Sequence, residues 1–85
     1  MLDLYELEQF VAFAELGTLS RVAEKFHIST PSITRSMQHL EESFGVSLFS
    51  RGKNRIELND TGRFTVEYAR KLLADAKQTV DQIQA

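Results

Sequence analysis

The chain has 85 residues, 42% of them hydrophobic and 26% charged, which is enough for one small globular domain. It contains no cysteine, so a disulfide framework and a thiolate metal site are excluded. No apolar run approaches the roughly 20 residues of a membrane span, and the first residues lack the pattern of a secretory signal, so we expect a cytoplasmic protein with no membrane partner.

The net charge of −2 is low for a nucleic-acid binder, but the charges are unevenly distributed along the chain. Residues 1–17 contain four acidic residues and no basic one, whereas residues 18–56 contain six basic residues and three acidic ones. The field that attracts phosphates is local, so the basic middle of the chain matters more than the total charge.

Residues Leu4–Leu16 form the first predicted helix, because their apolar side chains recur at three- and four-residue spacing. Gly17 is expected to end it, and Thr18 to cap a short second helix that continues to about Lys25. The side chains expected to face inward from these two helices are Leu4, Leu7, Phe10, Val11, Phe13, Ala14, Val22, Ala23 and Phe26.

A tight connection then leads to Ser29, a good N-cap residue, and to a third helix from Thr30 to about Phe44. Pro31 falls in the first turn of this helix, where its missing N–H group costs nothing, and Gly45 is expected to end it. The apolar residues form one narrow stripe and leave the rest of the helix surface polar: Ile33, Met37, Leu40 and Phe44.

Two short strands are predicted next, at Val46–Ser50 and Arg55–Leu58. Between them, Gly52 and Asn54 tolerate positive φ angles, so we expect a hairpin. The tip of this hairpin carries several basic residues.

The last helix is expected to begin after Asn59, as N-cap, and to continue to about Gln84. Only its first part is needed to close the core of so small a domain, yet an apolar stripe continues along it, from which Phe64 and Tyr68 are rotated away. We expect this stripe to pair with the same helix of a second copy, the alternative being an end that frays. The stripe consists of Ala69, Leu72, Leu73, Ala76, Val80 and Ile83.

Together these elements predict a mostly α fold, a winged helix-turn-helix with a three-helix core and a small β-hairpin wing, followed by a long linker helix. The expected division of the chain is 1–58 for a DNA-binding domain and 59–85 for a linker and dimerisation helix.

In a helix-turn-helix, the N-terminal part of the second helix of the motif enters the major groove and contacts base edges. Hydroxyl groups, an arginine suited to guanine and a glutamine suited to adenine occur in that segment. The candidate DNA-contacting residues are Ser29, Thr30, Pro31, Ser32, Thr34, Arg35 and Gln38. The alternative is a helix face that is only solvated.

The predicted wing offers a second group of candidates, for contact with a minor groove or with the phosphates beside it: Arg51, Lys53, Asn54 and Arg55. The alternative is a charged hairpin tip that only discourages pairing at the sheet edge.

Neither a metal site nor a catalytic site is expected. His27 and His39 have no Cys, Asp or Glu at ligand spacing, and the Ser, His and Asp residues form no nucleophile motif. We therefore expect no enzyme activity and no cofactor.

Over its full length the sequence resembles the N-terminal DNA-binding domain of LysR-type bacterial transcriptional regulators. The matching segments follow one another without gaps: FVAFAE at 10–15, GTLSRVAE at 17–24, ISTPSITR at 28–35, LE at 40–41, FGV at 44–46, LF at 48–49, Arg51 and NDTG at 59–62.

The resemblance implies a homodimer, or a tetramer of a full-length protein, that binds double-stranded DNA at interrupted inverted repeats. It also implies a small-molecule effector bound only by a C-terminal domain outside this chain, which is then a fragment or a truncated form. Carried over by position, the base-reading residues are Thr30, Pro31, Thr34 and Arg35, while Thr18 and Ser20 lie near phosphates.

The sequence departs from the family's pattern at two of these positions. Thr30 stands where the family often has glutamine, so the preferred bases are left open. Asn54 stands where the family often has arginine, so the minor-groove contact is expected from Lys53 or Arg55 instead. Two alternatives remain, a winged-helix module that binds protein without DNA and a winged-helix repressor of another family.

Overall fold

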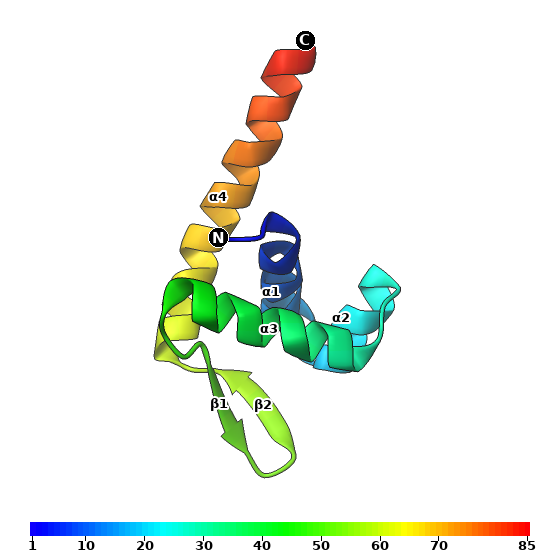
Figure 1. Cartoon of the computed structure of the whole chain (residues 1–85), viewed down its shortest axis with the longest axis vertical. Helices are drawn as coiled ribbons and strands as arrows, with labels where there is room; N and C mark the ends of the chain where they lie inside the picture. The colour runs from blue at the N-terminus through cyan, green and yellow to red at the C-terminus, as the bar shows by residue number, and fades with distance from the viewer.

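The computed structural model describes residues 1–85 and contains four helices and one two-stranded antiparallel sheet (Figure 1). The predicted winged helix-turn-helix with a long final helix is confirmed. The elements in chain order are α1 (Leu4–Leu16), α2 (Leu19–Phe26), α3 (Thr30–Phe44), β1 (Phe49–Gly52), β2 (Arg55–Leu58) and α4 (Asp60–Gln84).

The helix ends are set by capping residues. The side chains of Thr18, Ser29 and Asn59 accept hydrogen bonds from backbone N–H groups in the first turns of α2, α3 and α4, at 3.2, 3.2 and 2.7 Å. Gly17 and Gly45 end α1 and α3 in the left-handed conformation, which glycine adopts without strain. The predicted ends of all four helices are therefore confirmed to within one residue.

The core lies where α1 packs against α2, α3 and α4. Leu7, Phe10, Val22, Ile33 and Leu40 are fully buried there. The wing is attached to this core by Phe49, whose ring meets those of Phe10 and Phe13 edge to face at centroid distances of 5.9 and 5.4 Å. The most buried aromatic side chains therefore fix the base of the wing.

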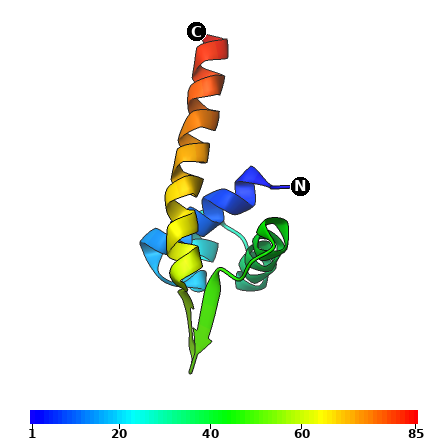
Figure 2. The ribbon, with the colours of Figure 1, turned by 90° about the vertical axis from the view of Figure 1, so that its left-hand side faces the viewer.

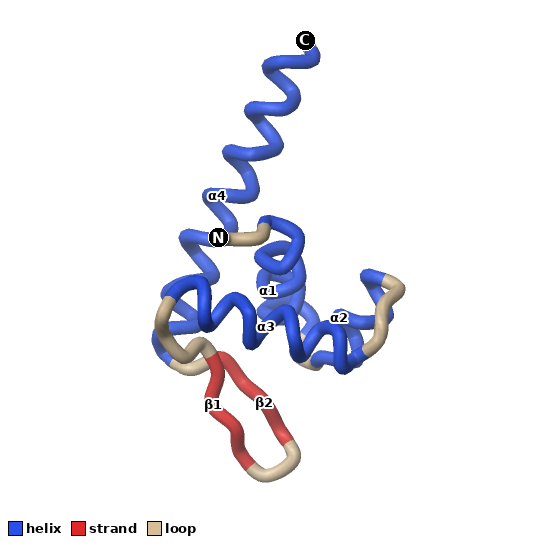
Figure 3. The backbone as a smooth tube through the Cα atoms, viewed as in Figure 1, coloured by secondary structure: helices blue, strands red, loops and turns tan.

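The wing and α4 extend from the body in opposite directions, which gives the molecule extents of 49 × 26 × 22 Å (Figures 1 and 2). The buried residues of α4, which are Gly62, Val66 and Ala69, all belong to its first part. Residues 77–85 are all exposed. The C-terminal end of the longest helix therefore extends away from the body without packing against it, as the tube in Figure 3 shows.

The prediction for the first strand was partly wrong. β1 begins at Phe49 rather than at Val46, because the backbone N–H of Leu48 donates to the Glu41 carboxylate at 2.8 Å and does not pair with β2. The hairpin turn is shorter than expected, since Gly52 pairs with Arg55 and only two residues connect the strands. Of the two residues expected to tolerate positive φ, only Asn54 uses it, at 61°.

Two predicted inward-facing residues are exposed, Leu4 and Phe44, and within α1 two residues not assigned to the core are buried, Gln9 and Ala12. The reason is that α1 is covered on three sides, by α2, α3 and α4, so its buried surface is wider than one stripe. None of the helices combines the length and the apolar character of a membrane span.

Candidate nucleic-acid interface

α2 and α3 form the helix-turn-helix. His27 ends α2 in the left-handed conformation, with φ at 57°, and the backbone N–H of Ile28 donates to the Ala23 carbonyl at 3.1 Å. The chain then turns into the N-cap Ser29. This compact turn fixes the first residues of α3 at the surface of the molecule.

The seven candidate residues of α3 divide by exposure. Ser29, Thr30, Pro31, Arg35 and Gln38 are exposed, as a DNA-contacting helix face requires. Ser32 and Thr34 are half-buried and lie on the flanks of this face. The buried residues on the opposite side of the helix are Ile33, Met37 and Leu40.

Three of these side chains contact one another. The hydroxyl oxygens of Ser29 and Ser32 are 2.9 Å apart, and an Arg35 guanidinium N–H donates to the Ser32 hydroxyl oxygen at 3.2 Å. The arginine is therefore held along the surface of α3 in the DNA-free chain. Helical periodicity alone does not predict this link.

The candidate phosphate contacts, Thr18 and Ser20, lie at the start of α2 with their hydroxyl oxygens 3.4 Å apart. A surface hollow lies between this helix start and the wing, and it is lined by Thr18, Ser20, Asn54 and Arg55 among others. The structure therefore brings together two groups of candidates that the sequence placed more than 30 residues apart.

The four candidate residues of the wing are all exposed. Opposite partners in an antiparallel pair point to the same face, so Arg51, opposite Ile56, lies on the face of Phe49 and Leu58, while Arg55 lies on the other face. Arg55 pairs with Glu57 at 3.3 Å, which neutralises part of its charge. Lys53 occupies the turn and makes no ion pair.

The ion pairs explain how an acidic chain can present a positive surface. Glu15 pairs with Arg70 at 3.0 Å, and three of the four basic residues of α4 have a carboxylate partner. The basic residues that have none are Arg21, Lys25, Arg35, Arg51, Lys53 and Lys71. All of these except Lys71 belong to the helix-turn-helix or to the wing.

The predicted pairing stripe on α4 is partly used within the chain. Ala69 is buried in the core and Leu73 packs against it, so these two residues cover the body of their own domain. Ala76 is half-buried, while Leu72, Val80 and Ile83 remain exposed.

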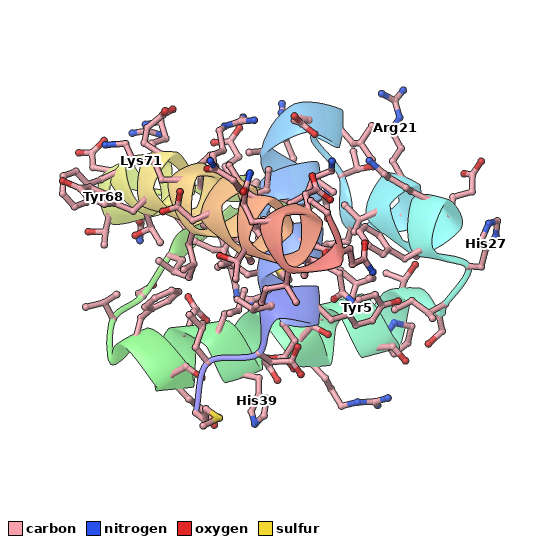
Figure 4. All side chains as sticks on the ribbon, turned by 90° about the horizontal axis from the view of Figure 1, so that it is seen from above. Tyr5, Arg21, His27, His39, Tyr68 and Lys71 are labelled. Atoms are coloured by element: carbon pink, nitrogen blue, oxygen red, sulfur yellow. The ribbon has the colours of Figure 1, made fainter.

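Two large exposed apolar side chains of α4 lie outside the predicted stripe. Phe64 and Tyr68 are 65% and 57% exposed, and their ring centroids are 5.0 Å apart. The Lys71 ammonium lies 5.4 Å from the centre of the Tyr68 ring. Tyr68 and Lys71 lie at one edge of the molecule, far from Arg21 and His27 (Figure 4). The exposed apolar surface of α4 therefore includes Phe64 and Tyr68 as well as Leu72.

The two histidines have separate surroundings. His27 is exposed at the turn between α2 and α3, and His39 Nδ1 lies 3.0 Å from the Glu6 carboxylate, where α3 passes α1 (Figure 4). No three His, Asp or Glu side chains are grouped closely enough to hold a metal ion.

Comparison with known proteins gives one consistent result. Residues 4–63 match the family described as bacterial regulatory helix-turn-helix protein, lysR family. The HTH-type transcriptional regulator TcbR of Pseudomonas sp. (strain P51) is 38% identical over 84 residues, which are 99% of this chain and 29% of TcbR. The chain thus spans under a third of the length of that relative.

Two similar solved structures have almost the same extent as this chain. The DNA-binding domain of CbnR in complex with DNA matches with a TM-score of 0.90 and 37% identity, covering 98% of this chain and 95% of that one. The DNA-binding domain of BenM with catB site 1 DNA matches with a TM-score of 0.89 and 34% identity, covering 98% and 89%.

Proposed function

Because the chain belongs to the LysR family of bacterial regulatory helix-turn-helix proteins, we propose that it binds double-stranded DNA sequence-specifically, as the DNA-binding part of a transcriptional regulator. The observation that carries this proposal is the concentration of unpaired cations on the helix-turn-helix and the wing, next to an exposed polar face of α3. The relatives are regulators, so binding rather than catalysis is the function proposed.

In this proposal the N-terminal half of α3 lies in the major groove. Arg35 binds the O6 and N7 atoms of a guanine, and Gln38 contacts a base or a phosphate one turn further along the helix. Thr30, Pro31 and Thr34 contact neighbouring bases or thymine methyl groups. The exposure of Thr30, Pro31, Arg35 and Gln38 supports this orientation.

Phosphates are bound on either side of that groove. Thr18 and Ser20 supply hydroxyl groups at the start of α2, and Arg51, Lys53 and Arg55 supply charge from the wing. The surface hollow shared by α2 and the wing turn supports one continuous contact with the DNA backbone. Asn54 adopts the positive φ of the turn. Lys53 is the basic residue beside it at the tip, and it reaches the minor groove.

Two copies of the chain pair through α4. The exposed apolar surface of this helix, with Phe64, Tyr68, Leu72, Val80 and Ile83, supports self-association. Residues 1–58 then contact DNA and residues 59–85 join two copies, although the first part of α4 also packs on the core. A two-fold pair suits an interrupted inverted repeat, with half-sites about 34–36 Å apart or a multiple of that spacing.

In a full-length regulator, an effector-binding domain following this chain responds to a small molecule, and the assembly is a dimer or a tetramer. Access to chromosomal DNA places such a protein in the bacterial cytoplasm.

Titration of labelled duplex DNA with the chain at several salt concentrations tests the proposal. We expect tighter binding to a selected duplex than to a scrambled one, and a linear fall of log K with log salt concentration. Failure to bind any duplex at low salt would overturn the proposal.

A further inference from the structure

The side chains of Ser29, Ser32 and Arg35 form a hydrogen-bonded row along the first turns of α3. The backbone N–H of Ser32 and the Ser32 hydroxyl lie 3.2 and 2.9 Å from the Ser29 hydroxyl oxygen, and Arg35 Nη2 lies 3.2 Å from the Ser32 hydroxyl oxygen. No other partner is available to the Ser32 hydroxyl in the structure.

The chemistry of arginine fixes the direction of one hydrogen bond in this row. A guanidinium has only donors, so the Ser32 oxygen must accept from Arg35. Between the two hydroxyl groups either serine can be the donor, because the Ser32 oxygen has a second lone pair, while the Ser29 oxygen also accepts from the backbone N–H of Ser32. In either arrangement the Ser32 oxygen holds the Arg35 guanidinium.

The guanidinium at the end of the row presents donors only. Arg35 uses one N–H group on Ser32, makes no ion pair, and keeps its other N–H groups for a ligand. Glu6 and Glu42 line the same surface hollow as Arg35, yet the Glu6 carboxylate contacts His39 instead. Because no carboxylate pairs with Arg35, its remaining N–H groups suit the acceptor edge of guanine and a phosphate oxygen beside it.

We propose that Ser32 is a positioning residue that sets the base specificity of Arg35, rather than a residue that contacts DNA itself. This inference rests on the proposed DNA-binding function. Ser32 holds the guanidinium on α3 before DNA arrives, so less side-chain freedom is lost on binding, and the ordered arginine discriminates more strongly between guanine and adenine.

The test uses the position of the DNA site at which Arg35→Ala loses the preference of the wild type for guanine. For the whole chain, we measure the dissociation constants of duplexes with adenine and with guanine at that position and take their ratio. We expect Ser32→Ala to reduce this ratio about fivefold, as the loss of one ordinary hydrogen bond implies. Ser32→Thr retains the hydroxyl and should restore the ratio.

Ser36→Ala is the matched control. Ser36 is half-buried one turn further along α3 and makes no side-chain hydrogen bond, so its removal should leave the ratio unchanged. In the Arg35→Ala background, Ser32→Ala should have no further effect on base preference, because Ser32 acts through Arg35.

Two results would overturn the inference. The first is that the ratio for Ser32→Ala lies within twofold of the wild-type ratio. The second is that Ser32→Ala loses the same affinity for all duplexes, which indicates that Ser32 contacts a phosphate directly. Failure of the proposed function gives a different result, since the unmodified chain would then show no base preference at any position.

Discussion

Gly62, in the first turn of α4, lies directly against the carbonyl group of Leu48 at the base of the wing. A Cβ atom at position 62 would overlap the Leu48 oxygen and lie 3.1 Å from Leu58 Cδ2. The same carbonyl accepts a hydrogen bond from the backbone N–H of Asn59 at 3.0 Å. The start of α4 is therefore docked on the wing through backbone atoms, which cannot move aside as a flexible side chain can.

Gly62→Ala is expected to destabilise the fold, although alanine is ordinarily the better helix former. Overpacking against backbone costs about 1–3 kcal/mol, which exceeds the roughly 1 kcal/mol that alanine gains over glycine within a helix. Urea unfolding measures the change. Gly52→Ala serves as control because nothing lies within 4 Å of a Cβ there, and equal stability of the two variants would contradict the predicted clash.

Glu41→Ala should loosen the connection between α3 and the wing. The buried Leu48 N–H donates to the Glu41 carboxylate at 2.8 Å, and an unsatisfied buried donor costs about 1–3 kcal/mol. Glu41→Gln keeps an acceptor oxygen and should recover most of the loss. The neighbouring Glu42 is exposed and makes no hydrogen bond through its side chain, so Glu42→Ala should match wild type in thermal unfolding. Equal melting temperatures for Glu41→Ala and Glu42→Ala would refute this role.

Leu72→Glu should shift the chain from dimer to monomer. Leu72 is 40% exposed on the apolar surface of α4, and burial of such a side chain in an interface contributes about 1.5–3 kcal/mol. Leu73 is a poorer choice, because it packs against the core of its own domain. Ala74, exposed on the opposite side of the helix, offers the control Ala74→Glu. Sedimentation at matched concentrations decides: the prediction fails if wild type is monomeric at tens of micromolar or if Leu72→Glu remains dimeric.

Lys53→Ala should weaken binding to most DNA sequences and reduce the slope of log K against log salt concentration by about 1, as expected for one lost phosphate contact. Arg55→Ala should reduce it less, because Arg55 is partly neutralised by Glu57. Lys71→Ala on α4 is the control, since Lys71 is equally without an ion pair but lies over the Tyr68 ring. An unchanged slope in Lys53→Ala would show that the wing does not contact DNA.

The helices were predictable because their ends depend on local signals. Thr18, Ser29 and Asn59 cap α2, α3 and α4 as expected, and Gly17 and Gly45 end α1 and α3. The start of β1 was not predictable in this way, since it depends on a hydrogen bond between Leu48 and Glu41, seven residues away and on another element.

The candidate site was predicted at the level of elements rather than of contacts. The exposed face of α3 follows from helical periodicity, so Pro31, Arg35 and Gln38 were found. Periodicity does not reveal rotamers, and the link from Ser32 to Arg35 was missed although the two residues are three apart. On α4, periodicity joined Ala69 and Leu73 to one stripe with Val80. Packing within the chain buries Ala69 and half-buries Leu73, and it leaves Phe64 and Tyr68 exposed.

Selection of binding sites from random duplex DNA, repeated with Arg35→Ala, tests the central claim most directly. We expect wild type to enrich an inverted repeat whose half-site centres are one helical turn apart or a multiple of it, with a guanine preference that the variant loses. On the selected site, Arg35→Ala should cost about 1–3 kcal/mol of binding free energy. A pool without an enriched motif, or an equal loss of affinity for selected and scrambled duplexes in Arg35→Ala, would contradict sequence-specific binding through α3.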